Sequence, residues 1–387
     1  MAKNLFEEFD GVSSKQWKQQ IQFELKGADY NDTVIWNSPE HIKVKPFYHY
    51  DEFQENYAPH KGNASFRICQ NIFVHDLDKS ISRANKSIDR GAESIRFTIQ
   101  DDKIDVTKLL ESLPLEKITV YFNLSFLSND FVKKIEGIAK EKKAFVFCNL
   151  DPIGQLSQDG NWFLTREKDN FETLNLLSNH IVNSSFLSID GSLYQNAGAN
   201  MVQQIAYSLS HANEYFNRIT TINKPIVFQL SVGTNYFFEI AKLRALRLLF
   251  NLIAKEYNHN LDCHLLVSPT KRNKTLYDYN VNLLRTTTEC MSAILGGADA
   301  IANLPYDSLY HKDNEFGDRI ARNQLLVLKH ESYFDKVNNP ADGSYYIESL
   351  TQQLAEKSLT LFKEIEANGG FLKQLKEAII KIKIQES

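Results

Sequence analysis

The sequence predicts an α/β fold: a closed eight-stranded parallel (β/α)8 TIM barrel with an N-terminal arm and a C-terminal helical extension. Eight short apolar runs alternate with longer segments whose apolar residues recur at helical spacing. Strands that alternate with helices pair in parallel through right-handed crossovers. Eight such units over about 270 residues match the usual size of this barrel. A doubly wound open sheet stays the alternative, because a count of eight favours the barrel without excluding the sheet.

The arm is expected to cover residues 1–62. Residues 13–16 can form a capping box that starts an amphipathic helix, and two short extended pieces follow. These segments hold too few apolar residues for a core of their own. We therefore expect the arm to pack on the chain's own barrel or to clamp a partner subunit, with Trp17 and Trp36 as candidate interface anchors.

The barrel is expected to cover residues 63–335 and the extension residues 336–387. In the extension, turn residues precede an amphipathic helix that should end at Gly369-Gly370, and a last helical segment should follow over 372–384. The predicted strands are, in chain order, 65–73, 94–100, 118–124, 144–150, 186–191, 226–232, 264–268 and 298–304.

The amino-acid composition limits the functional classes to which the protein can belong. The chain has 387 residues, 43% hydrophobic and 24% charged, which is typical of a globular protein. A net charge of −4 argues against a nucleic-acid partner, and no apolar run is long enough to span a bilayer. Four widely spaced cysteines form no CxxC pair and are expected to be free thiols, three of them buried among apolar residues. Free thiols, with a polar N-terminus unlike a signal peptide, predict a cytoplasmic location.

Three stretches carry more specific information: LRTTTECMSAILGGADAI (284–301), RIARNQLLVLKHES (319–332) and NPADGSYYIESLTQQLAEK (339–357). LKGADY and IKVKPFY in the arm, and NLDPIGQL and NYFFEIAKLRALRLL in the barrel, extend the pattern. Together they resemble the cobalamin-dependent methylmalonyl-CoA mutase family. The resemblance implies an isomerase that interconverts methylmalonyl-CoA and succinyl-CoA with adenosylcobalamin, in propionate metabolism.

Active sites of such barrels lie at the carboxyl ends of the strands, and there the chain departs from the family pattern. The first strand end reads Cys-Gln-Asn where active members carry Arg-Gln-Tyr, so Asn71 stands in place of the substrate-pressing Tyr. After the fifth strand, Leu193 occupies the position of the His that polarises the thioester carbonyl. An aliphatic side chain cannot donate that hydrogen bond. No catalytic residue is therefore expected in this chain.

Six positions, Asn71 among them, are expected to face a substrate. His264 stands near an Arg position of the family, although Leu265, Leu266 and Val267 replace polar neighbours. Asn196 can equally serve as a helix cap. The substrate-facing candidates are Gln70, Asn71, Gln195, Asn196, His264 and Ser268.

Active members also need a polar channel along the barrel axis for the pantetheine of coenzyme A. The bulky runs at 118–123 and 144–149 predict an axis filled by side chains instead. The family's cobalamin domain carries Asp-x-His-x-x-Gly, and here Asp262-Cys263-His264 is followed by Val267 where Gly is needed. We expect adenosylcobalamin in a complex but not on this chain, and no metal site.

These observations predict the small, structural subunit of a heterodimeric mutase whose large catalytic subunit binds substrate and cofactor. A coenzyme A thioester is expected to bind this chain weakly at most. Three alternatives stay open: the catalytic barrel of a split mutase with a separate cobalamin-binding chain, a free-standing acyl-CoA-binding pseudoenzyme, and a truncated sequence that continues natively into a degenerate cobalamin-like domain.

Overall fold

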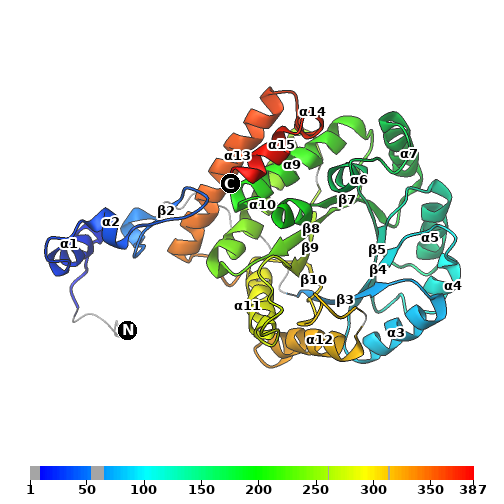
Figure 1. Cartoon of the computed structure of the whole chain (residues 1–387), viewed down its shortest axis with the longest axis horizontal. Helices are drawn as coiled ribbons and strands as arrows, with labels where there is room; N and C mark the ends of the chain where they lie inside the picture. The colour runs from blue at the N-terminus through cyan, green and yellow to red at the C-terminus, as the bar shows by residue number, and fades with distance from the viewer. Residues whose placement is uncertain (1–8, 54–64, 260, 313) are drawn as a thin grey trace, which may run out of the picture.

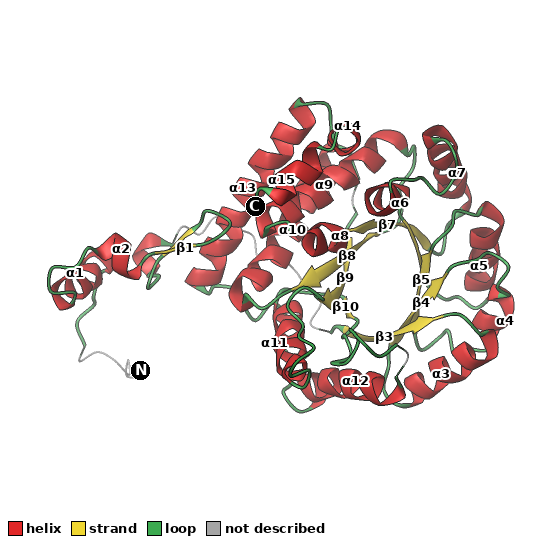
Figure 2. Ribbon diagram, viewed as in Figure 1, coloured by secondary structure: helices red, strands yellow, loops and turns green. Residues whose placement is uncertain are grey.

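The computed structural model describes residues 9–53, 65–259, 261–312 and 314–387. Its parallel strands close into an eight-stranded barrel in the order β10-β3-β4-β5-β6-β7-β8-β9 (Figure 2). The predicted TIM barrel is confirmed, and the open sheet is excluded because β10 pairs with both β3 and β9. The barrel strands are β3 (Arg67–Phe73), β4 (Ser94–Ile99), β5 (Thr119–Leu124), β6 (Val146–Leu150), β7 (Ser185–Asp190), β8 (Ile226–Val232), β9 (Cys263–Pro269) and β10 (Ala300–Ile301).

Helices surround the strands as an outer ring (Figure 1). Strands buried on both faces carry near-continuous apolar runs. All seven residues of β8 are buried, for example. The helices between and after the strands are α3 (Leu77–Asp89), α4 (Val106–Glu111), α5 (Asn129–Glu141), α6 (Pro152–Asp159), α7 (Glu167–His180), α8 (Ser192–Ala197), α9 (Met201–Arg218), α10 (Tyr236–Glu256), α11 (Val281–Leu295) and α12 (Glu315–His330).

The C-terminal extension packs on one side of this ring. Helix α13 (Tyr345–Ala367) lies along α9 and α10 (Figure 1). It is followed by Gly369 and Gly370, both with positive φ, where the sequence predicted its end. The last segment forms two short helices, α14 (Phe371–Lys376) and α15 (Ile379–Gln385), rather than one. The break lies at Ala378, whose φ of 60° is left-handed.

The arm projects away from the barrel (Figure 1). It contains α1 (Ser14–Glu24), α2 (Tyr30–Val34), the antiparallel pair β1 (Trp36–Asn37) and β2 (Lys43–Val44), and the 3₁₀ turn Tyr50–Glu52. The predicted capping box between Ser13 and Gln16 is present. The predicted boundary between arm and barrel, at residues 62–63, lies outside the described residues.

The inner end of the arm packs on the body, and Ile42 and Val44 are buried in the main core. Trp36 meets Phe238 of α10 edge to face, with ring centroids 5.6 Å apart. Tyr48 packs on Tyr346 of α13 at 5.0 Å. In contrast, none of the residues of α1 is buried. The arm is thus anchored at its inner end, while α1 contacts other parts of the arm, with Trp17 against Phe47 at 5.6 Å.

Candidate functional site at the carboxyl ends of the strands

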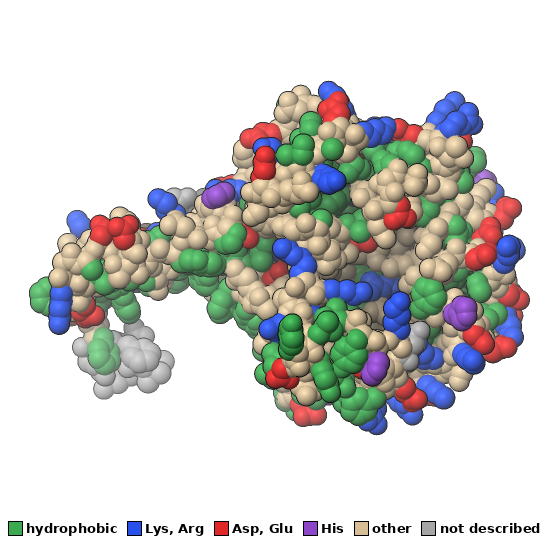
Figure 3. Space-filling model, in the orientation of Figure 1, with side chains coloured by type: hydrophobic (Ala, Val, Ile, Leu, Met, Phe, Trp, Pro, Cys, Tyr) green, Lys and Arg blue, Asp and Glu red, His purple; other side chains and the backbone are tan. Residues whose placement is uncertain are grey.

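A cavity of about 630 Å³ lies at the carboxyl ends of the strands. Its volume is in the range of small-molecule sites. Figure 3 looks onto this end of the barrel, where Lys and Arg side chains gather around a central hollow. Its strand and strand-end lining comes from β3, β4, β5, β7, β8, β9 and β10: Asn71, Ile72, Phe73, Arg96, Thr98, Asn123, Asp190, Gln229, Leu230, Ser231, Ser268, Pro269 and Ala302.

Arg96 of β4 organises the floor of this cavity. Its Nε donates to Oδ1 of Asn71 at 2.7 Å, and its two terminal nitrogens lie 3.5 Å from Oε1 of Gln229 and from Oγ of Ser268. Asn123 donates to the same Gln229 oxygen at 3.0 Å. The guanidinium therefore connects four strands through neutral partners.

Directly below, aromatic side chains fill the barrel axis. Tyr121 stacks on Phe147 with ring centroids 4.9 Å apart, and Phe147 stacks on His264 at 4.4 Å. The Tyr121 hydroxyl lies 2.8 Å from Nε2 of His264. Cys69 and Leu266 belong to the same buried inner cluster. The cavity is thus open toward the carboxyl ends and closed toward the amino ends of the strands.

This burial changes the titration of the inner groups. It lowers the pKa of His264 to about 4, so the ring is neutral at pH 7. It also raises the pKa of Tyr121 well above its ordinary value and raises that of the Cys69 thiol. All three groups are therefore uncharged at neutral pH, as an apolar barrel interior requires.

Two of the predicted substrate-facing residues lie elsewhere. Gln70 points outward from β3, and its Oε1 accepts a hydrogen bond from Arg322 of α12 at 2.8 Å. The physical reason is the alternation of strand side chains: Asn71 faces the interior, so its neighbour Gln70 cannot. His264 does face the interior, but it lies at the start of β9, at the opposite end of the strand from the cavity. Neither Gln70 nor His264 is among the residues that line this cavity, and their contact with a substrate stays a prediction.

The other candidates come together. Asn71, Ser268 and Asn196 line the cavity. Gln195 is buried beside it, where its Oε1 accepts from the hydroxyl of Thr270 at 2.8 Å. Leu193 lies half-buried in α8 and is not among the lining residues.

A buried acid positions the adjoining strand end. Oδ1 of Asp151 accepts hydrogen bonds from Nε2 of His211 at 2.8 Å and from the Tyr215 hydroxyl at 2.6 Å, and Oδ2 accepts from the backbone N–H of Asp190 at 2.7 Å. Burial alone would raise the pKa of Asp151, but the neighbouring His211 and these hydrogen bonds lower it below its ordinary value. The ionised Asp151 thereby holds Asp190 at the cavity wall.

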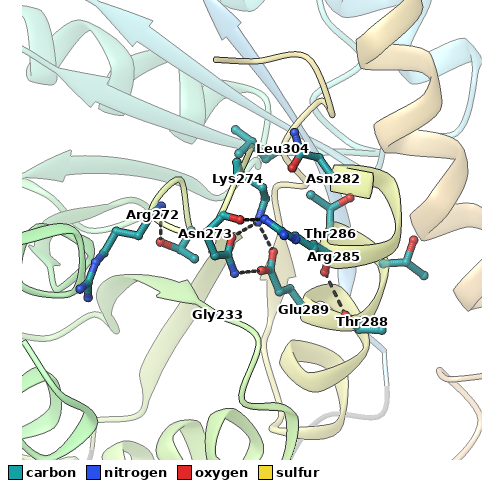
Figure 4. A network of polar contacts seen from close by, with 12 residues as sticks. Gly233, Arg272, Asn273, Lys274, Asn282, Arg285, Thr286, Thr288, Glu289 and Leu304 are labelled. Carbon is teal, nitrogen blue, oxygen red and sulfur yellow. Dashed lines mark hydrogen bonds and ion pairs between the residues drawn. The ribbon is translucent and has the colours of Figure 1, made fainter. Parts of the chain in front are cut away.

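A second buried network fixes the loop between β9 and α11 (Figure 4). Lys274 donates to Glu289 of α11 at 2.6 Å, and Asn273 donates to the other oxygen of that carboxylate at 2.5 Å. The side chains of Lys274 and Glu289 are only 2% and 0% exposed, so the pair is fully desolvated. Burial lowers the pKa of Lys274 and raises that of Glu289. This pair stabilises the loop that brings Lys271 to the rim of the cavity.

Sequence reasoning missed three interior residues of this site, namely Arg96, Asn123 and Gln229. Each is a polar side chain within an apolar strand, in SIRFTI, TVYFNL and IVFQLSV. That pattern could have identified them from the sequence, because a polar residue in an otherwise buried strand requires a hydrogen-bond partner inside the barrel.

Within the described ranges, no group of three or more His, Cys, Asp or Glu side chains is arranged to hold a metal ion. No described helix is both long and apolar enough to cross a membrane.

Comparisons with known proteins identify the family. Residues 100–387 match the family model described as methylmalonyl-CoA mutase. The whole chain aligns at 31% identity with the methylmalonyl-CoA mutase small subunit of Porphyromonas gingivalis, over 68% of that protein. The chain belongs to the methylmalonyl-CoA mutase family.

Other family members are longer than the part that aligns here. The methylmalonyl-CoA mutase of Cereibacter sphaeroides is 28% identical over 96% of this chain and 61% of its own length. The human mitochondrial mutase is 26% identical over 96% of this chain and 57% of its own length. The chain therefore spans about three fifths of these two mutases.

Proposed function

We propose that this chain is the non-catalytic small subunit of a heterodimeric methylmalonyl-CoA mutase, an isomerase that acts through adenosylcobalamin on its large subunit. The observation that carries the proposal is the filled barrel axis. Tyr121, Phe147 and His264 fill the barrel axis. The family resemblance implies that active members bind the pantetheine of a coenzyme A thioester along this axis. Such a thioester therefore binds this chain weakly at most.

The residues at the positions of the family's reacting groups support the same function. Asn71 and Leu193 stand at the positions where the family pattern has Tyr and His. Asn71 is engaged by Arg96, and Leu193 offers no hydrogen-bond donor for a thioester carbonyl. With neither group in place, this barrel holds no machinery to orient or polarise the substrate.

The residues present do not fit cobalamin either. His264 follows Asp262 with the first spacing of the family's ligand motif, but its ring stacks on Phe147 inside the barrel and its Nε2 lies against Tyr121. An imidazole held by these two contacts is not placed as a ligand for a cofactor that would bind outside the barrel interior. We assign the cofactor to the partner.

The arm supplies the partner surface in this proposal. Trp17 and Phe23 of α1 are 51% and 80% exposed, and Trp36 is 47% exposed. Exposed aromatic side chains on a projecting element are typical of a protein-protein interface. The neighbour that they fit is the large catalytic subunit. Four free, buried cysteines agree with a reducing, cytoplasmic setting for the complex.

The test is an activity assay on the isolated chain with methylmalonyl-CoA and adenosylcobalamin. Neither the wild-type chain nor Asn71→Tyr/Leu193→His should form succinyl-CoA, because the axis remains filled in both. The same assay on the purified complex is the positive control. Measurable turnover by either isolated chain would overturn the proposal.

A further inference from the structure

Arg96 is a positive charge inside the barrel whose hydrogen bonds go to neutral side chains. Among the described residues, no carboxylate forms an ion pair with its guanidinium, whose hydrogen-bond acceptors are the neutral Asn71, Gln229 and Ser268. Asp190 lines the same cavity, but one oxygen of its carboxylate accepts from the N–H and the hydroxyl of Ser192. Arg96 is only partly buried and lines the open cavity, so its charge faces the space that a ligand would enter.

The guanidinium also has N–H donors that lack an acceptor among the described residues. It carries five N–H donors in a planar fork, and three of them have acceptors here. Two of those three contacts are long, at 3.5 Å. Asn71 therefore orients the fork through Nε, while the terminal nitrogens remain available to an acceptor that enters the cavity.

The surroundings favour an anion. The described lining contains four Lys or Arg side chains, Arg83, Arg96, Lys271 and Lys312, against two Asp, Asp190 and Asp318. Arg83 and Asp318 form an ion pair with each other. Uncharged polar side chains complete the wall, among them Thr98, Ser192, Asn196, Ser231 and Ser308. They can bind the polar body of a ligand whose charged group meets Arg96.

The shape limits the size of that ligand. Because Tyr121 and Phe147 close the axis below Arg96, the ligand enters only from the carboxyl ends of the strands. A cavity of about 630 Å³ holds a compact molecule rather than an extended thioester arm.

From the position of the Arg96 guanidinium in the cavity, its free donors and the cationic rim, we propose that this cavity binds a small organic anion whose carboxylate or phosphate group is held by Arg96. The site requires no partner chain and no cobalamin. It therefore goes beyond the proposed function, and its test can fail while the mutase assignment stands.

The first experiment is isothermal titration calorimetry on the full chain at constant ionic strength, with inorganic phosphate in one arm and succinate in the other. Wild-type chain should bind one of these probes at one site per chain. Arg96→Gln should bind it at least about tenfold more weakly, as expected for a lost charge-assisted hydrogen-bond pair. Lys134→Gln, which removes the same charge from the exposed face of α5, should bind like wild type. Preference for phosphate or for succinate identifies the ligand's anionic group.

Equal binding by wild type and Arg96→Gln, or no saturable binding of either probe, would overturn the proposal. A second measurement covers the case in which Arg96→Gln fails to fold. Crystals of the wild-type chain soaked in arsenate, as the phosphate probe, or in bromosuccinate, as the carboxylate probe, should show an anomalous peak in the cavity, with the anionic group within hydrogen-bond distance of the Arg96 guanidinium. An empty cavity, or peaks only on the outer surface, would contradict the assignment.

Discussion

The hydroxyl of Tyr121 on β5 lies 2.8 Å from Nε2 of His264 on β9, although 143 positions separate them in the sequence. The contact crosses the interior of the barrel, and Phe147 stacks on both rings. It joins the two halves of the barrel where a substrate channel would otherwise run. The closed axis, rather than any single substituted side chain, is the structural basis for our proposal that a partner carries out catalysis.

The neutral His264 should make stability pH-dependent. Its folded pKa of about 4 lies below the unfolded value of 6.5, so the unfolded chain binds more protons between these pH values. The free energy of unfolding should therefore fall as pH drops from 6.5 to 4, with a slope from this group of up to ~1.4 kcal/mol per pH unit. In urea unfolding series, His264→Gln should flatten this dependence, and exposed His75→Gln should not. A slope unchanged by His264→Gln would contradict a part-buried ring that is neutral at pH 7.

Phe147 should be a major contributor to the barrel core. Phe147→Ala leaves a void between Tyr121 and His264 and should lower the free energy of unfolding by about 3–5 kcal/mol. Phe23→Ala makes the same change at a side chain that is 80% exposed and should cost less than about 0.5 kcal/mol. Chemical denaturation measures both. Similar losses for the two variants would mean that the axis is not tightly packed.

The desolvated pair of Lys274 and Glu289 should be intolerant of single changes. Glu289→Gln leaves a buried ammonium without its counter-charge and should destabilise the chain by about 3–5 kcal/mol. Glu172→Gln breaks the exposed pair with Lys168 and should cost at most about 1 kcal/mol. Thermal and urea unfolding would compare the two, and equal effects would argue that water reaches Lys274.

Trp17 should matter for assembly and not for folding. Because α1 contains no buried residue, Trp17→Ala should change the free energy of unfolding by less than about 0.5 kcal/mol. As an interface anchor it should contribute about 2 kcal/mol or more to binding of the large subunit. Leu176→Ala, at a 51% exposed side chain of α7, is the matched control. Surface plasmon resonance with the large subunit measures both affinities, and unchanged affinity for Trp17→Ala would remove the arm from the interface.

The sequence predicted the barrel well because its signals are local. Apolar runs between turn residues mark β8 and β9, the capping box marks the start of α1, and Gly369-Gly370 marks the end of α13. The interior of the site was harder to predict. Whether a strand residue faces inward depends on register, so Gln70 and Asn71 are neighbours in sequence but face opposite sides of the barrel.

The position of a residue along its strand, relative to the cavity, was the second feature that the sequence did not predict. The sequence predicts that His264 faces a substrate because its strand can be recognised. In the structure, however, His264 lies near the start of β9 and Ser268 lies near its end. Arg96 was missed because its partners come from β3, β8 and β9. Pairings between distant strands follow from closure of the barrel, and no local pattern encodes them.

The measurement that tests the central claim most directly is affinity purification of the tagged chain from its own host, with mass spectrometry and a mutase assay on the eluate. The account predicts a larger mutase chain in a one-to-one ratio, activity in the eluate, and no activity when this chain is purified alone. Activity of the chain alone, or recovery of a small cobalamin-binding protein in place of a large mutase chain, would contradict it.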